Sequence, residues 1–81
     1  MASKIGQIVS LIQGAAYVEN PMRSDYYAAL ACRDANRKRT FEGRISAMKQ
    51  ALRQYRVTVS HDGDGVIRIR NTVTGAEYLA K

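Results

Sequence analysis

The residues with the clearest chemical potential lie in the stretch HDGDG, which begins at His61. Asp62 and Asp64 are separated by one glycine, a spacing that matches the first ligands of a calcium loop. An EF-hand loop starting at Asp62 would need a glycine at its sixth position and a glutamate at its twelfth. The chain has Ile67 and Val73 there. The stretch therefore favours a turn over a metal site, and we expect no metal or other cofactor.

The one cysteine and the one histidine, Cys32 and His61, are the only candidates for a nucleophile and its base. Cys32 lies in the apolar helical pattern YYAALACRDA, where a free thiol acts as a small hydrophobic residue. We expect His61 at the edge of a sheet, so the two side chains do not suggest an active site, and we predict no enzymatic activity. A lone cysteine suits a reducing compartment, and no apolar run is long enough for a membrane span. The sequence therefore predicts a cytoplasmic protein without a membrane partner.

The basic residues are concentrated in one part of the chain. The segments on either side of residues 37–56 have no net charge, so this segment accounts for the whole net charge of +6. Its only acidic residue is Glu42, and its basic residues are Arg37, Lys38, Arg39, Arg44, Lys49, Arg53 and Arg56. Such an asymmetry is typical of a protein that binds a polyanion or an acidic protein surface.

Three helices must position these residues. Apolar residues spaced three and four apart predict a first helix over residues 4–17, with Ser3 as its N-cap and the sequence ENP as its end. Its apolar stripe comprises Ile5, Ile8, Val9, Ile12 and Ala16. Ser24 can cap a second helix that turns Tyr27, Leu30 and Ala31 inward.

The third helix has the most regular apolar series. Its members are Phe41, Ile45, Met48, Leu52 and Tyr55. Extending that phase backward would bury Asp34 and Lys38, which is costly, so we expect two helices joined near residues 36–40, with Thr40 as the second N-cap. One long bent helix over residues 24–56 is the alternative. On a helical wheel Lys49, Arg53 and Arg56 form a stripe on one flank of the apolar series.

After Arg56 the pattern changes to alternation, which predicts three short strands. The loop Gly63-Asp64-Gly65 sets Val59 opposite Ile69 and His61 opposite Ile67 on one face. On the other face it sets Thr58 opposite Arg70 and Ser60 opposite Arg68.

For the second hairpin we expect the loop VTG, with Gly75 in a left-handed conformation. This register pairs Ile69 with Leu79 on the inner face and Arg70 with Tyr78 on the outer face. Arg68, Arg70 and Tyr78 would then form a cationic and aromatic patch of the kind that binds single-stranded nucleic acid, although an ordinary amphipathic sheet has the same pattern.

The elements predict one α+β domain over residues 1–81, with three helices followed by a small three-stranded antiparallel sheet. The order resembles that of a winged helix over residues 24–79. In that resemblance the second and third helices form a helix-turn-helix and a hairpin follows as the wing. The connection RKRT lacks the turn glycine of that motif, and the hairpin tip carries Asp62 and Asp64.

Two functions fit these features. The first is a small regulator that binds nucleic acid, more readily DNA than RNA, through phosphate contacts of the third helix. The second is an inhibitor or adaptor of the kind that phages and mobile elements encode, docked on an acidic surface of a larger enzyme or complex. The candidate binding residues are the seven basic residues of residues 37–56 together with Arg68, Arg70 and Tyr78. The protein can act as a monomer or a homodimer.

Overall fold

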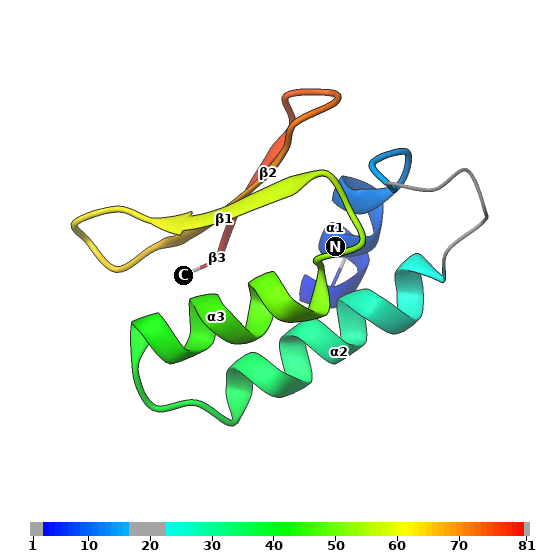
Figure 1. The fold of residues 1–81 in the computed structure, drawn as a ribbon. Coiled ribbons are helices and arrows are strands. Elements are labelled where there is room, and N and C mark those ends of the chain that lie inside the picture. Colours follow the sequence, from blue (N-terminus) through cyan, green and yellow to red (C-terminus); the bar gives the residue numbers. More distant parts are fainter. Residues whose placement is uncertain (1–2, 17–22, 81) are drawn as a thin grey trace.

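A computed structural model describes residues 3–16 and 23–80 of the chain. The elements follow the order α1 (Lys4–Ile12), α2 (Ser24–Asn36), α3 (Phe41–Ala51), β1 (Val57–His61), β2 (Ile67–Asn71) and β3 (Glu77–Ala80). The strands form an antiparallel sheet in the order β1-β2-β3, and the helices lie on one side of it (Figure 1). The predicted α+β class and the order of elements are confirmed.

The first helix begins as expected but ends earlier. The Ser3 side chain accepts a hydrogen bond from the Gly6 amide at 3.0 Å, which confirms the N-cap. The helix ends at Ile12 because Gly14 takes a left-handed backbone conformation (φ 81°), and the chain then turns away. The predicted end at Tyr17 is therefore wrong, and the sequence ENP lies outside the described residues.

The buried stripe of α1 is also rotated from the expected one. Leu11 is buried beside Ile8 and Ile12, whereas Ile5 is exposed. The chain after α1 then lies against the end of the α3 region, where Ala16 forms an isolated antiparallel bridge with Tyr55.

The chain between residues 24 and 56 forms two helices, and Thr40 caps the second of them. Its hydroxyl oxygen accepts a hydrogen bond from the Gly43 amide at 3.0 Å. The expected cap at Ser24 is wrong, because Ser24 already belongs to the helix and Arg23 occupies the cap position without a side-chain cap bond.

The apolar series of α3 forms the centre of the core. Met48 and Leu52 are each 1% exposed, and Ile45 and Tyr55 are buried as well. Phe41, at the start of the helix, differs from these buried residues because 42% of its surface is exposed. Its ring stacks on His61 with 6.3 Å between the ring centroids.

The first hairpin has the register that its turn predicts. Val59 pairs with Ile69 and His61 with Ile67, and the loop closes on a hydrogen bond from the Asp62 amide to the Val66 carbonyl. The Asp62 carboxylate accepts from the amides of Asp64 at 3.2 Å and Val66 at 3.3 Å. This aspartate therefore stabilises the turn.

The second hairpin is shifted by one residue from the expected register. Ile69 pairs with Tyr78, and Arg70 pairs with Glu77, because the loop contains four residues, 72–75, rather than three. Asn71 causes the extra length, since its side-chain oxygen accepts from the amides of Val73 at 2.8 Å and Thr74 at 3.1 Å. Gly75 is left-handed as expected (φ 81°).

Asn71 also joins the sheet to the first helix. It is 1% exposed, and its side-chain amide donates a hydrogen bond to the Leu11 carbonyl at 2.7 Å. That carbonyl belongs to the last turn of α1, where backbone acceptors have no partner inside the helix. One buried side chain thus shapes the β2–β3 turn and holds α1 against it.

Replacing Asn71 by alanine should lower the free energy of unfolding by about 2–3 kcal/mol, because the variant cannot form three hydrogen bonds around buried groups. Urea denaturation would measure the change, with the exposed Asn36→Ala as the matched control. A loss below about 0.5 kcal/mol for Asn71→Ala would contradict the bridging role.

A second prediction concerns the tip of the first hairpin. Gly65 and Gly75 both have left-handed φ values, but a Cβ at Gly65 would lie 2.7 Å from the Phe41 ring, whereas one at Gly75 would meet nothing within 4 Å. Gly75→Ala should therefore cost about 1–2 kcal/mol for backbone strain alone, and Gly65→Ala should cost clearly more. Equal losses in thermal unfolding would show that the tip does not pack on Phe41.

Candidate binding surface along the third helix

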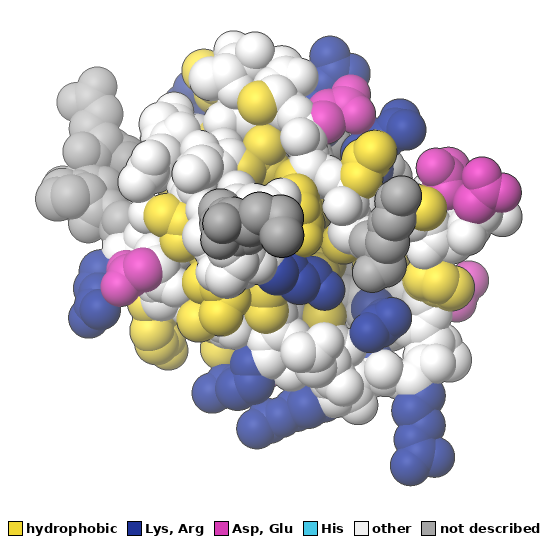
Figure 2. Space-filling model, turned by 180° about the vertical axis from the view of Figure 1, so that it is seen from behind, with side chains coloured by type: hydrophobic (Ala, Val, Ile, Leu, Met, Phe, Trp, Pro, Cys, Tyr) yellow, Lys and Arg dark blue, Asp and Glu magenta, His cyan; other side chains and the backbone are white. Residues whose placement is uncertain are grey.

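Five exposed basic residues of residues 37–56 have no carboxylate within 4.0 Å among the described residues. In residues 3–16 and 23–80 the ion pairs are Arg23–Asp25, Arg33–Asp34 and Arg68–Glu77, all outside that segment. We call the basic face the set of Arg37, Lys38, Arg39, Lys49 and Arg53. Seen from behind, Lys and Arg side chains project from the lower edge of the molecule, below the level of the acidic side chains in that view (Figure 2).

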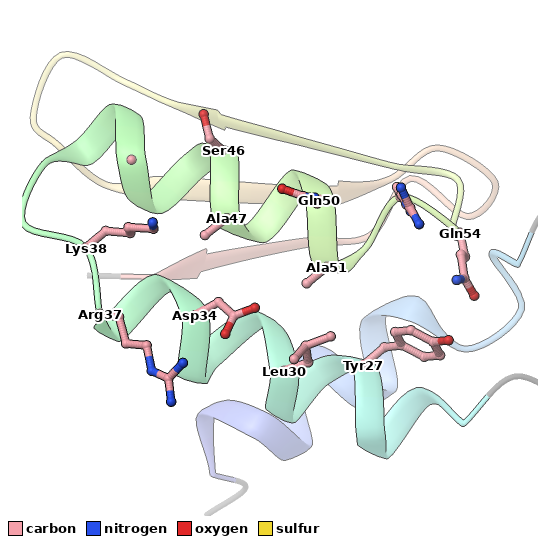
Figure 3. Close-up of a pocket in the computed structure, with 12 residues that line it drawn as sticks. Tyr27, Leu30, Asp34, Arg37, Lys38, Ser46, Ala47, Gln50, Ala51 and Gln54 are labelled. Carbon is pink, nitrogen blue, oxygen red and sulfur yellow. The ribbon is translucent and has the colours of Figure 1, made fainter.

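The helix pair α2 and α3 forms a groove that runs along both helices. It has a volume of about 540 Å³. The wall from α2 and its end consists of Tyr27, Leu30, Asp34, Arg37 and Lys38 (Figure 3). The wall from α3 and its end consists of Gly43, Ser46, Ala47, Gln50, Ala51, Arg53 and Gln54.

The lining residues also reveal how the two helices run. Lys38, after the end of α2, lies beside Gly43, near the start of α3. Tyr27 and Gln54 share the other end of the groove (Figure 3). The helices are therefore an antiparallel pair lying side by side. A helix-turn-helix crosses its helices at about 90–120°. The element order matches a winged helix, but this pairing differs from the one that the motif uses to read a groove of DNA.

A second, smaller groove borders the other flank of α3. It has a volume of about 270 Å³ and lies between the end of α3 and β1. Lys49 and Arg53 line it beside Val57 and Thr58. Because Arg53 lines both grooves, the end of α3 and the turn after it form a ridge between them, with Lys49 and Arg53 on it.

The structure separates the other predicted site residues from this ridge. Arg44 lines a small cavity of about 70 Å³ together with Lys4 and Phe41, on the opposite flank of α3 from Lys49. Arg56 is exposed at the start of β1, where its carbonyl accepts hydrogen bonds from Thr72.

The expected patch on the outer face of the sheet is not formed. The register turns Tyr78 to the inner face beside Ile69 and places Leu79 outside. Burial, with a smaller effect of the Cys32 thiol, raises the pKa of Tyr78. Arg68 is paired with Glu77 at 3.3 Å, so Arg70 remains without an aromatic neighbour on that face. The prediction that placed Tyr78 beside these arginines is wrong.

The candidates for nucleophilic chemistry occupy different environments. Cys32 is buried in the core, and burial raises the pKa of its thiol. His61 is exposed, and its ring packs on Phe41. Within the described ranges no three His, Cys, Asp or Glu side chains gather as possible metal ligands. The absence of enzymatic activity stays a prediction.

We call the groove between α2 and α3 the main groove. The sequence analysis did not identify two buried polar groups near its Tyr27 end. The side-chain oxygen of Gln54 and the hydroxyl of Tyr55 are buried, and neither has a hydrogen-bond partner in the part of the chain that is described. Tyr55 packs against Tyr27 with 6.0 Å between ring centroids, and burial, helped by Tyr27, raises the pKa of Tyr55. No sequence pattern marks Gln54, because its environment depends on how α2 and α3 pair.

Comparisons with protein-family models, with curated proteins and with solved structures found no match for this chain. In the described ranges no helix has the length and apolar character needed to cross a membrane.

The inward position of Tyr78 can be tested with its neighbour as the control. Tyr78→Ala should lower the free energy of unfolding by about 2–4 kcal/mol, because the ring packs against the core. Leu79→Ala should cost less than about 0.5 kcal/mol, since that side chain is exposed. A larger loss for Leu79→Ala than for Tyr78→Ala in urea denaturation would contradict this position and support the register expected from the sequence.

Proposed function

We propose that the protein binds nucleic acid through the basic face and acts as a small regulator. The observation that carries the proposal is the contrast between two sets of cations. Arg23, Arg33 and Arg68 each have a carboxylate within 3.3 Å, whereas the basic face has none within 4.0 Å among the described residues. Cations left unpaired in this way keep their full charge for phosphates.

The arrangement of α3 supports the same proposal. Its buried side is fixed by Met48 and the cap residue Leu52, so Lys49 is held on a rigid helix, and Arg53 follows in the turn directly after it. Ser46 and Gln50 share the exposed side with them, and hydroxyl and amide side chains can bond to phosphates or base edges. The helix thus combines charge with polar groups that suit nucleic acid.

A second candidate function is binding to an acidic protein surface. The observation that favours it is the main groove, where Leu30, Ala47 and Ala51 give the lining an apolar component between charged ends. An acidic segment of a partner protein could fill such a groove. This function predicts weak binding to nucleic acid at physiological salt.

The salt dependence of binding tests the first function. Changing Lys38, Lys49 and Arg53 to glutamine should keep the fold, because Lys38 and Arg53 lie outside the helices and glutamine has nearly the same helix propensity as Lys49. For each phosphate that the variant no longer neutralises, the slope of log affinity against log salt should fall by about 0.9 on duplex DNA, or about 0.7 on single strands. Fluorescence anisotropy over a salt series would measure the slope, and unrelated sequences should lose affinity alike.

The matched control is the triple change of Arg23, Arg33 and Arg68 to glutamine, which removes the same charge from paired positions. Exposed ion pairs contribute little to stability, so both triple variants should stay folded. The control should leave the slope nearly unchanged. Equal losses in both variants would assign the binding to net charge alone, and failure of the unmodified protein to bind at low salt would exclude this function.

A further inference from the structure

The main groove offers a more specific inference, which rests on the function proposed above. We propose that the groove between α2 and α3 binds a single strand of nucleic acid. Its bases lie in the groove, and the phosphates nearest to the two ends of the groove contact the cations there.

The dimensions of the groove suit a short single strand. From Tyr27 to Arg37 it follows α2 for about 15 Å, at about 1.5 Å of helix rise per residue. That length matches about four nucleotides at a spacing of about 3.4 Å. In a duplex the base faces are covered by stacking and pairing, so only an unpaired strand can place them inside the groove.

The lining of the groove offers surfaces for base faces. Tyr27 provides an aromatic ring at one end, and Leu30 and Ala47 provide apolar surface along the walls (Figure 3). Single-strand binders combine aromatic side chains, on which bases stack, with a basic groove that follows the backbone. The small side chains of Ala47 and Ala51 leave the room that a base needs.

The polar groups at the Tyr27 end supply hydrogen bonding for a base. The side-chain oxygen of Gln54 is buried without a donor in the described part of the chain. A buried acceptor without a partner is costly, and a base amine that donates to it once the Gln54 side chain turns toward the groove would remove the cost. This orphan acceptor lies at the same end of the groove as the aromatic ring (Figure 3).

The charges divide the groove into a base region and two phosphate regions. Arg37 and Lys38 lie at one end, and Arg53 lies beside Gln54 at the other. Asp34 lies near the first end, with its carboxylate 3.3 Å from the Arg33 guanidinium. Because Asp34 is paired in this way, the free cations at the two ends are the contacts for the phosphates nearest to those ends.

The proposal can be tested by measuring the affinity of the protein for a fluorescent single strand of about 12 nucleotides. The same strand annealed to its complement serves as the duplex for comparison. The single strand should bind more tightly than the duplex. Tyr27→Ala should weaken single-strand binding by roughly five- to a hundredfold, the loss expected for one base stack. Tyr27→Phe keeps the ring and should bind within about twofold of the unmodified protein.

Leu79→Ala is the control, because Leu79 is exposed on the outer face of the sheet and does not line the groove. A second pair of variants tests the proposal even if Tyr27→Ala does not fold. Ala47→Gln fills the groove and should weaken single-strand binding, whereas Ala29→Gln, on an exposed part of α2 away from the groove, should not.

Three results would overturn the proposal in distinguishable ways. Duplex binding as tight as single-strand binding would overturn the strand preference and leave the proposed function standing. Unchanged binding in both Tyr27→Ala and Ala47→Gln would show that the strand contacts the protein outside the groove. Absence of binding to either form, with saturable binding of a glutamate-rich peptide that Ala47→Gln abolishes, would overturn both proposals and assign the groove to a protein.

Discussion

Burial of one side of α3 is the constraint on which the rest of the structure depends. Met48 and Leu52 are almost completely covered, and they belong to the same side of the helix as Ile45. A helix fixed in this way cannot rotate, so its opposite side must face solvent. Lys49 owes its exposure to this packing, and the other residues of the basic face lie in the segments directly before and after the helix. The core and the centre of the proposed binding surface are thus two sides of α3.

The hairpin tip and the groove lie on different sides of that helix. The hairpin tip packs on Phe41 through Gly65 and His61. Gln50, which lines the groove, is half a turn away from Phe41 around the helix axis, at about 100° per residue. The carboxylates of Asp62 and Asp64 therefore stand apart from the groove. When the sequence alone is considered, the acidic tip argues against phosphate binding. In the structure the tip lies away from the groove side of α3, so that side stays basic.

The sequence predicted the features that depend on local chemistry. The caps at Ser3 and Thr40 and the first hairpin turn follow from side chains within a few residues of the backbone groups they bind. The break between α2 and α3 follows from the cost of burying charge. Two local predictions failed, because α1 ends before Gly14 and Ser24 lies inside α2. The shift of the second hairpin depends on contacts across the fold as well. Asn71 bonds to Leu11, far away in the sequence, and the same side chain lengthens the adjacent turn and reverses the faces of Tyr78 and Leu79. The site divides in the same way: the sequence located the basic segment, but the groove and its buried Gln54 oxygen appear only when α2 and α3 are paired.

The central claim is that the basic face, together with the exposed side of α3 and the groove beside it, forms the contact with nucleic acid. The most direct measurement is a map of backbone amide shifts in the unmodified protein during titration with an unlabelled single strand at low salt. The account predicts saturable shifts for residues 37–40, for the exposed side of α3 and for the groove wall at Tyr27 and Leu30, with the outer face of the sheet unchanged. Shifts centred on Arg68 and Arg70 instead, with α3 unaffected, would contradict it.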